Sequence, residues 1–461
     1  MNNPMKKLLF CFICICGCWG LFSCDDYDII ESENDENMQV NPERQGATPP
    51  TIDADWQLEL IPDVGRQADN LFVYKDQKYN RMFSRTLGWN GGIGGISTPL
   101  PDGSILWGFN ESYFGVVDAT NRARVSGNMP LNALLIQRAT NGKLGETSDD
   151  LISLADYVEW NDASSDKYLW GRTYMRHPNA NKTEEQIAKG EIDTGRAYYV
   201  GVASTATGKL QIIWEALTTM NNLVDGMSLT THSLDGTIPA NRYNALLKDY
   251  KPQEGDYLYQ ESKTEYLVKG GTFFGQALCN AGDGHLYLYA AKSNNIYVAR
   301  TKTLDLGSQW EYYIRNAETG IMEWQETYPT NAELTRSSII ENGYVAIQPT
   351  IFCEDGVYYM VSQGGTNSTE VYIYTASSPV GPFDNQKLLF NLPSFIDKVG
   401  ITTYNAINQV NTHPELSRNG ELVISACTKA NATAENYTYA GSADFTRPYF
   451  FRIYNWKEVY K

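Results

Sequence analysis

The chain has 461 residues, of which 42% are hydrophobic and 20% charged, and this balance excludes a protein that is disordered throughout. Its formal net charge of −17 argues against nucleic-acid binding, because phosphate groups are bound by basic surfaces. The chain has only 4 histidines, and no two of them lie within a few residues of each other. A compact metal-binding motif such as His-Glu-x-x-His is therefore absent.

The N-terminal residues predict export and lipid attachment. Lys6 and Lys7 precede a largely apolar run over residues 8–23, and a charged start followed by a short apolar stretch is typical of a secretory signal peptide. A membrane-spanning helix needs about 20 apolar residues, so an uncleaved anchor is one alternative, and a signal peptide without lipid attachment is another. The Leu-Phe-Ser sequence before Cys24 resembles a bacterial lipobox, in which the cysteine is acylated. Residues 1–23 are therefore predicted to be a lipoprotein signal peptide.

The residues after Cys24 predict a tether to a membrane surface. Asp25 and Asp26 begin an acidic stretch that resembles the surface-export signal of Bacteroidota lipoproteins, although a solvated acidic tether explains it as well. Residues 24–52 are polar, acidic and proline-containing, which favours a flexible linker. We therefore expect a monomer that is anchored in the outer membrane through Cys24 and exposed at the cell surface. One folded domain is expected over residues 53–461.

A tight turn followed by an apolar strand recurs along this domain. Each instance has a dipeptide ending in glycine and then a run rich in Tyr, Val, Ile, Leu or Trp, which favours a hairpin. The turns are Asp102-Gly103, Thr207-Gly208, Asp283-Gly284, Asp355-Gly356 and Asn419-Gly420. Five units of about 65–75 residues, the first with an insertion after it, predict an all-β fold, a five-bladed β-propeller. Two adjacent β-sandwiches are the competing architecture.

A propeller gathers the first strand of every unit around one axis, so residues distant in sequence meet at the mouth of a central channel. Glu111 follows a strong strand and is a candidate catalytic carboxylate facing that channel. His413 and Glu415 lie in the last unit, where strand alternation places them on one face. A histidine beside a carboxylate can act in acid–base catalysis or hold a substrate hydroxyl. The alternatives are a rim position for Glu111 and a structural pair that closes the ring for the other two.

Polar and aromatic residues near the expected channel are candidates for substrate binding. The chain has 31 tyrosines and 10 tryptophans; most of them are expected to pack between blades, but aromatic faces also stack on sugar rings. The glycine cluster 91–95 lies between strands, which favours close backbone approach at the channel over a phosphate-binding loop. The predicted binding residues are Trp89, Asn90, Asp118, His232, Arg242, Gln276, Gln348 and Asn405.

No metal site or cofactor is expected. Cys279, Cys353 and Cys427 lie far apart and form no Cys-x-x-Cys pair, so we interpret them as buried apolar residues of strands. An acidic channel mouth could hold a structural Ca²⁺ through oxygen ligands. However, the sequence has no Asp-x-Asp-x-Asp-Gly loop to support it.

Several segments resemble the bacterial five-bladed propeller families known as domains of unknown function 4185 and 5005. The segments are Pro99–Phe109, Phe274–Ala277, Asp283–Tyr289, Asn295–Arg300, Ser378–Phe383, Tyr404–Ala406, His413–Ser417, Gly420–Ser425 and Arg447–Phe450. The Ser-Pro-x-Gly-Pro-Phe pattern is shared with glycoside hydrolase family 43, whereas His-Pro-Glu-Leu-Ser together with Arg-Pro-x-Phe is more specific. The resemblance implies a sugar-acting propeller, and some relatives cleave arabinan-type glycans.

The resemblance also implies two or three carboxylates around the axis, one as an acid and one as a base or nucleophile. The sequence departs from the related patterns because Ile93 replaces an Asp and Gln348 replaces a Glu, whereas Glu111 keeps a carboxylate in place of an Asp. We therefore expect a glycoside hydrolase that acts on a complex polysaccharide or oligosaccharide through Glu111 and Glu415, assisted by His413. The alternatives are a surface glycan-binding protein without cleavage and a structural or protein-binding propeller.

Overall fold

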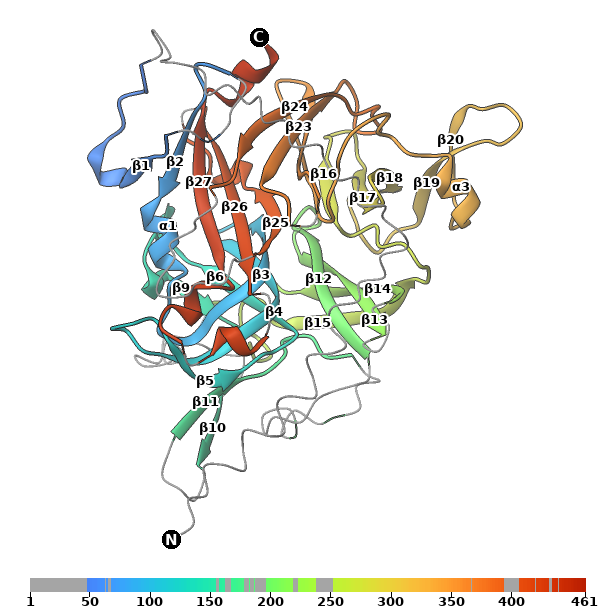
Figure 1. Cartoon of the computed structure of the whole chain (residues 1–461). Helices are drawn as coiled ribbons and strands as arrows, with labels where there is room; N and C mark the ends of the chain where they lie inside the picture. The colour runs from blue at the N-terminus through green and yellow to red at the C-terminus, as the bar shows by residue number, and fades with distance from the viewer. Residues whose placement is uncertain are drawn as a thin grey trace.

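The computed structural model describes residues 48–461 except 63, 65–67, 155–156, 162–166, 178–181, 183–185, 187–195, 219–222, 238–251, 366, 394–405, 419, 431–432 and 438. Five sheets of four or five strands each surround one axis, and we number them as blades 1–5 in chain order (Figure 1). Their inner strands are β3 (Leu87–Pro99), β12 (Arg196–Ser204), β16 (Ala277–Asn280), β21 (Thr350–Glu354) and β25 (Ala406–Thr412).

Contacts between neighbouring blades close the ring. β3 contacts β12 and β25, β16 contacts β12 and β21, and blade 4 also contacts β25 through β22 (Val357–Gln363). The five-bladed propeller predicted from the sequence is therefore confirmed, and two separate sandwiches are excluded.

The outer strands follow each inner strand as an antiparallel meander. Blade 1 contains β4 (Ile105–Val117), β5 (Arg124–Asn128), β6 (Asn132–Gln137) and β9 (Leu151–Ser153); blade 2 contains β13 (Leu210–Thr218), β14 (Leu223–His232) and β15 (Gln260–Val268). Blade 3 contains β17 (Leu286–Lys292), β18 (Asn295–Thr301), β19 (Trp310–Arg315) and β20 (Met322–Gln325). Blade 4 continues with β23 (Glu370–Ala376) and β24 (Asp384–Asn391); blade 5 contains β26 (Leu422–Lys429), β27 (Pro448–Tyr454), β2 (Phe72–Asp76) and β1 (Leu58–Leu60).

Two small hairpins and several short helices lie outside the five sheets. Two small hairpins are formed by β7 (Ala139–Thr140) with β8 (Lys143–Leu144) and by β10 (Tyr157–Asn161) with β11 (Lys167–Gly171). The α-helices are α1 (Gln77–Met82) and α3 (Asn331–Thr335). The 3-10 helices are η2 (Ala54–Trp56), η3 (Ser148–Asp150), η5 (Pro414–Leu416), η6 (Thr433–Asn436), η7 (Ser442–Asp444) and η8 (Trp456–Tyr460).

Strands from both ends of the domain share blade 5. Figure 1 shows β2 from the start of the domain beside β27 from its end, and Phe72 pairs with Tyr454. Arg452 of β27 donates a hydrogen bond of 2.6 Å to Asp76, which ends β2, and also pairs with Glu421. All three side chains are at most 2% exposed, so this buried charge triad ties the two ends together where water cannot screen it.

The turn glycines and the apolar strand faces explain why the blades form. The glycines of the five predicted turns, 103, 208, 284, 356 and 420, all have positive φ angles, between 76° and 93°. Each blade buries apolar side chains against its two neighbours, so that the core consists of separate clusters between successive blades. We call the end of the ring where the inner strands begin the mouth, and the end that carries these glycines the turn end.

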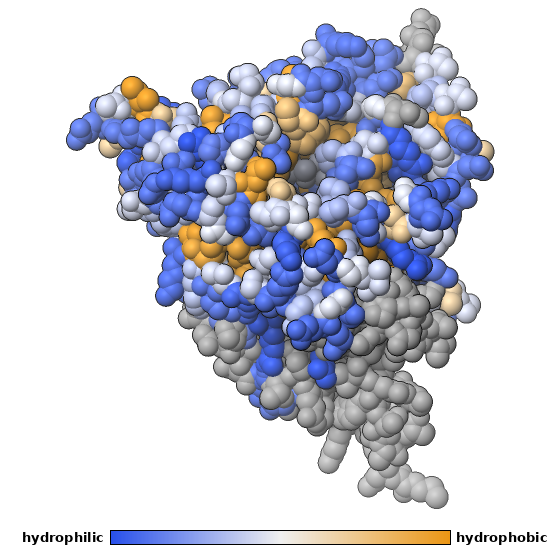
Figure 2. All heavy atoms as spheres, turned by 180° about the vertical axis from the view of Figure 1, so that it is seen from behind, coloured by the Kyte–Doolittle hydropathy of each residue, from blue (hydrophilic) through white to orange (hydrophobic). Residues whose placement is uncertain are grey.

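The surface fits an acidic globular domain. Figure 2 shows that hydrophilic residues predominate on the face opposite to the view of Figure 1, with hydrophobic residues in small groups. In the described part of the chain, no helix combines the length and the apolar character needed to cross a membrane. Cys279 and Cys427 are buried as expected, but Cys353 is exposed, because the short strand β21 turns this side chain outward.

Candidate active site

Glu111 lies near the mouth, where β4 passes the irregular first half of β3. The β3–β4 ladder shifts register between Trp89 and Ile93, and the neighbouring Asn110 pairs with Ile93. Glu111 itself has a φ of 39°, in the left-handed region that residues other than glycine seldom adopt. Such backbone strain, of order 1–3 kcal/mol, is concentrated at functional sites, so the position merits a functional explanation.

Two groups from neighbouring blades bind the Glu111 carboxylate. The Tyr199 hydroxyl, on β12 of blade 2, donates a hydrogen bond of 2.9 Å to Oε1. The Lys429 ammonium, at the end of β26 in blade 5, lies 3.6 Å from Oε2. Burial and the nearby Glu111 carboxylate raise the pKa of Tyr199 well above its usual value, so this hydroxyl keeps its proton. A hydroxyl donor and a cation are together the partners that suit an ionised carboxylate.

Glu215 supplies a second carboxyl group, on the same face of blade 2 as Tyr199. It is the ladder partner of Tyr199, and residues directly opposite each other on antiparallel strands point to one face of the sheet. Burial raises the pKa of Glu215 from 4.5 to about 7. Among the described residues it has no hydrogen-bond or ion-pair partner that would offset this burial. Glu215 is therefore half protonated near neutral pH.

The two carboxyl groups flank one tyrosine but have opposite surroundings. Glu111 is held by a donor and a cation, whereas Glu215 is desolvated and has no partner in the described part of the chain. Two carboxyl groups in contrasting environments can act as the base and the acid of one reaction. Hydrolysis of a glycosidic bond uses one carboxyl group as the acid and another as the base or nucleophile.

Side-chain amides from blades 3, 4 and 5 contact one another. Gln276 Oε1 accepts a hydrogen bond of 3.2 Å from the Gln348 backbone, and the Gln348 side chain accepts one from Gln409. Gln348 and Gln409 have φ angles of 56° and 62°, a second instance of left-handed backbone at the mouth. Gln409 Oε1 is buried without a partner and lies 3.4 Å from the place where a side chain at Gly94 would begin. The structure thus brings together the predicted binding residues Gln276 and Gln348.

His413 and Glu415 lie away from Glu111. Ser97, near the end of β3, donates to the Glu415 carboxylate, and its hydroxyl lies 2.6 Å from His413 Nδ1. The ladder partner of Ser97 is Trp107, four residues before Glu111, a distance of about 13 Å along β4. Carboxyl pairs in glycosidases are about 5–9.5 Å apart. The expected pairing of Glu111 with Glu415 is therefore corrected, because the two lie toward opposite ends of the ring.

The surroundings of His413 also argue against acid–base catalysis. Its side chain is completely buried against Trp107 and Phe450, and its second nitrogen lies 2.8 Å from the Ser425 hydroxyl. Burial lowers the pKa of His413 to about 3, so the ring stays neutral at physiological pH. His413 is thus a packing and hydrogen-bonding residue between blades 5 and 1.

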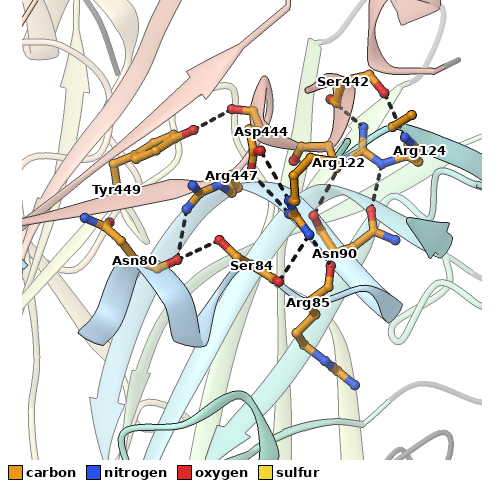
Figure 3. A network of polar contacts seen from close by, with 12 residues as sticks. Asn80, Ser84, Arg85, Asn90, Arg122, Arg124, Ser442, Asp444, Arg447 and Tyr449 are labelled. Carbon is orange, nitrogen blue, oxygen red and sulfur yellow. Dashed lines mark hydrogen bonds and ion pairs between the residues drawn. The ribbon is translucent and has the colours of Figure 1, made fainter. Parts of the chain in front are cut away.

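Three predicted binding residues of blade 1 have other roles. Trp89 is fully buried and bonds to Ser112, so its ring cannot stack on a ligand. Asn90 is also fully buried and accepts a hydrogen bond of 2.7 Å from Arg124, in the arginine-rich network of Figure 3. The Asp118 carboxylate caps the turn after β4 by accepting from the Thr120 amide at 2.7 Å. Complete burial contradicts the expectation that Trp89 and Asn90 bind substrate directly, whereas substrate binding by Asp118 stays a prediction.

His232 is corrected as well. It pairs with Leu210, two residues after the turn glycine 208, so it lies at the turn end rather than at the mouth. Burial lowers the pKa of His232 to about 4, and both ring nitrogens have partners, the Thr230 hydroxyl and the Leu258 carbonyl. Arg242, Asn405 and Cys24 lie outside the described residues.

The sequence prediction missed Tyr199, Glu215, Lys429 and Gln409 as site residues. A positional signal could have found two of them, because Glu111, Glu215 and Lys429 follow the turn glycines 103, 208 and 420 by eight, seven and nine residues. Seven to nine residues of extended strand are long enough for the second strand of a blade to run from the turn end to the mouth. Over the described residues, no group of three His, Cys, Asp or Glu side chains could hold a metal ion.

Comparison with solved structures found several similar chains. The chain is similar to a crystal structure described as a "putative hydrolase" from Bacteroides ovatus, with 38% identity, a TM-score of 0.81 and coverage of 90% of this chain and 98% of that one. A GH43_1 enzyme from Xanthomonas citri, solved with xylotriose, is 12% identical with a TM-score of 0.36 over 82% of this chain and 91% of that one. A GH43 β-xylosidase/α-arabinofuranosidase from a compost metagenome is 10% identical with a TM-score of 0.37 over 79% and 90%.

A search of curated proteins found no match. The model of the domain of unknown function DUF5005, however, matches residues 76–456, which span all five blades from the last residue of β2 to beyond β27. This match confirms the resemblance to domain 5005 that motifs of the first, third, fourth and fifth units indicated. The chain therefore belongs to the DUF5005 family of five-bladed β-propellers.

Proposed function

We propose that the protein is a glycoside hydrolase in which Glu215 is the general acid and Glu111 is the base or nucleophile. The observation that carries the proposal is the contrast between these two carboxyl groups on either side of Tyr199. The description of the Bacteroides ovatus relative as a "putative hydrolase" supports a hydrolytic reaction. The substrate class is a complex polysaccharide or oligosaccharide.

Each residue has a role that follows from its surroundings. Glu215 donates its proton to the oxygen of the leaving sugar, because burial keeps it protonated at a higher pH than an exposed carboxyl group. Glu111 activates water or attacks the anomeric carbon, and the Tyr199 hydroxyl orients it. Lys429 lies close enough to Glu111 to stabilise its negative charge between turnovers.

The test is hydrolysis of arabinan, xylan and galactan, measured as new reducing ends. Glu111→Gln and Glu215→Gln are each expected to lower turnover at least about 100-fold while saturable binding remains, because each removes one half of the acid–base pair. Glu318→Gln removes a carboxylate from the exposed β19–β20 turn and is the control. Full activity of both site variants on a substrate that the wild type cleaves would remove this pair from the mechanism.

A second function, glycan binding without cleavage, is favoured by the two positions where related propellers have acids. Ile93 is buried at 5% exposure, and the Gln348 side chain is engaged with Gln409, so neither supplies a carboxyl group. This function predicts saturable binding of a polysaccharide together with no new reducing ends after prolonged incubation. If the wild type cleaves a glycan and Glu215→Gln does not, the hydrolase is the correct function of the two.

We further propose that the protein is a surface lipoprotein of the outer membrane. The support is the sequence around Cys24 and the acidic residues that follow it. Two acyl signals hold a protein firmly to a bilayer, whereas one chain binds only marginally. Cys24→Ser should move the protein from the membrane fraction to the soluble fraction and abolish labelling with a fatty-acid analogue. Retention of both label and membrane association in this variant would contradict lipid attachment at Cys24.

A further inference from the structure

The loop that leads into blade 4 exposes two large apolar side chains at the mouth. Six large hydrophobic residues are exposed in the described part of the chain, and two of them, Tyr344 at 55% and Ile347 at 45%, lie three residues apart in this loop. The loop, residues 341–349, ends at β21 and contains Gln348 of the amide group described above. Exposed apolar side chains that cluster at a binding site indicate ligand contact more strongly than isolated ones do.

Hydrogen bonds hold this loop rigidly. The Tyr344 amide donates to the Tyr374 hydroxyl at 3.0 Å, and the same hydroxyl donates to the Tyr344 carbonyl at 2.7 Å. Further along, the Ala346 amide donates to Ser362 at 3.0 Å and the Gln348 amide to Gln276 at 3.2 Å. Tyr374 is itself fully buried, so the exposed Tyr344 ring is presented on a fixed backbone. A preorganised aromatic side chain loses little conformational entropy when a ligand stacks on it.

A second ring extends the exposed aromatic surface. Tyr372 of β23 lies beside Tyr344, with ring centroids 6.1 Å apart and an angle of 34° between the planes. The aliphatic Ile347 follows on the same loop. We call these three residues the blade 4 platform.

A continuous line of contacts joins the platform to the candidate catalytic pair. Lys429, which lies 3.6 Å from Glu111, ends β26 beside the start of β25. Ile407, the second residue of β25, accepts a hydrogen bond of 3.0 Å from the Gln363 side chain of blade 4. The Gln363 carbonyl accepts one of 3.2 Å from the amide of Ala346, which directly precedes the exposed Ile347. The platform and the pair therefore belong to the same rim, two blades apart around the ring.

We propose that the blade 4 platform is a saccharide-binding subsite that stacks on the apolar face of a sugar ring in the chain being cleaved. This inference rests on the proposed hydrolase function and adds a separate binding subsite and a minimum length of the substrate chain. A ligand that reaches from the pair on blades 1 and 2 to a platform on blade 4 contains several sugar residues, so the substrate is a glycan chain and not a disaccharide. Aromatic faces suit this task because the C–H groups of a sugar ring are apolar.

The experiment compares Tyr344→Ala, Tyr344→Phe and Ile321→Ala. Phenylalanine keeps the stacking ring, and Ile321, 65% exposed on the β19–β20 hairpin, is the surface control. Binding is measured by affinity electrophoresis and calorimetry with arabinan, xylan and galactan and with their oligosaccharides of two to six sugars. We expect Tyr344→Ala to weaken binding of the longest ligands at least about 10-fold and to leave disaccharide binding unchanged, whereas Tyr344→Phe and Ile321→Ala bind as the wild type does.

The outcomes separate the platform from the proposed hydrolase. Wild-type affinity of Tyr344→Ala for every chain length overturns the platform, even if Glu215→Gln abolishes cleavage. Loss of long-chain binding in Tyr344→Ala together with unchanged cleavage by Glu215→Gln supports the platform and overturns the catalytic pair. An equal loss for disaccharides and long chains places Tyr344 at the cleavage site and overturns a separate subsite. Absence of wild-type binding to all of these glycans overturns the inference as stated.

Discussion

The pKa of Glu215 makes a prediction that needs no knowledge of the substrate. Burial raises this pKa from 4.5 to about 7, so between these pH values the unfolded chain releases a proton that the folded protein keeps. The associated stability is complete below pH 4.5 and is lost as the pH rises to about 7. At about 1.4 kcal/mol per pH unit, the loss amounts to about 3 kcal/mol. Glu215→Gln removes the titrating group and keeps the shape of the side chain.

The assay is chemical or thermal unfolding of the wild type, Glu215→Gln and Glu318→Gln at pH 4 and pH 8. The stability of Glu215→Gln relative to the wild type should rise by about 3 kcal/mol from the lower to the higher pH, which is a few degrees in Tm for a domain of this size. The Glu318→Gln control measures the change in stability caused by removing an exposed carboxylate. If the difference between Glu215→Gln and the wild type is the same at both pH values, Glu215 is not desolvated, and its assignment as the general acid fails with it.

Three further results are expected. Turnover should fall about tenfold per pH unit above pH 7, because Glu215 must be protonated to act as the acid; a rate that stays level to pH 9 would contradict this. Tyr199→Phe should lower turnover more than it weakens binding, since its hydroxyl positions Glu111, and equal losses in kcat and affinity would indicate a binding role instead. Arg452→Leu should destabilise the domain by about 3–5 kcal/mol in chemical unfolding, because it leaves two buried carboxylates without a cation, and a change below about 1 kcal/mol would show that the triad does not close the ring.

The number of blades could be predicted because its signals are local. Each blade has a turn that needs a glycine with positive φ. The strand after this turn either alternates apolar and polar residues or is apolar throughout. Each blade can therefore be recognised from a segment of about ten residues. Glu111 was predicted from the apolar strand residues that precede it, although the structure places it within β4 and not after it. Glu415 was misassigned because it precedes the turn glycine 420, so it lies at the turn end. Glu215 and Lys429 follow their turns and therefore reach the mouth.

The amino-acid sequence by itself determined the all-β class and the five units, because turn chemistry and side-chain alternation act between neighbouring residues. Only the tertiary structure decided which carboxyl groups meet, since that depends on the direction of each strand around the ring and on contacts between blades. The same contacts desolvate Glu215, which has no partner among the residues that the structure describes, and place Tyr199 and Lys429 around Glu111. The chemistry of the site is therefore a property of how the blades pack against one another.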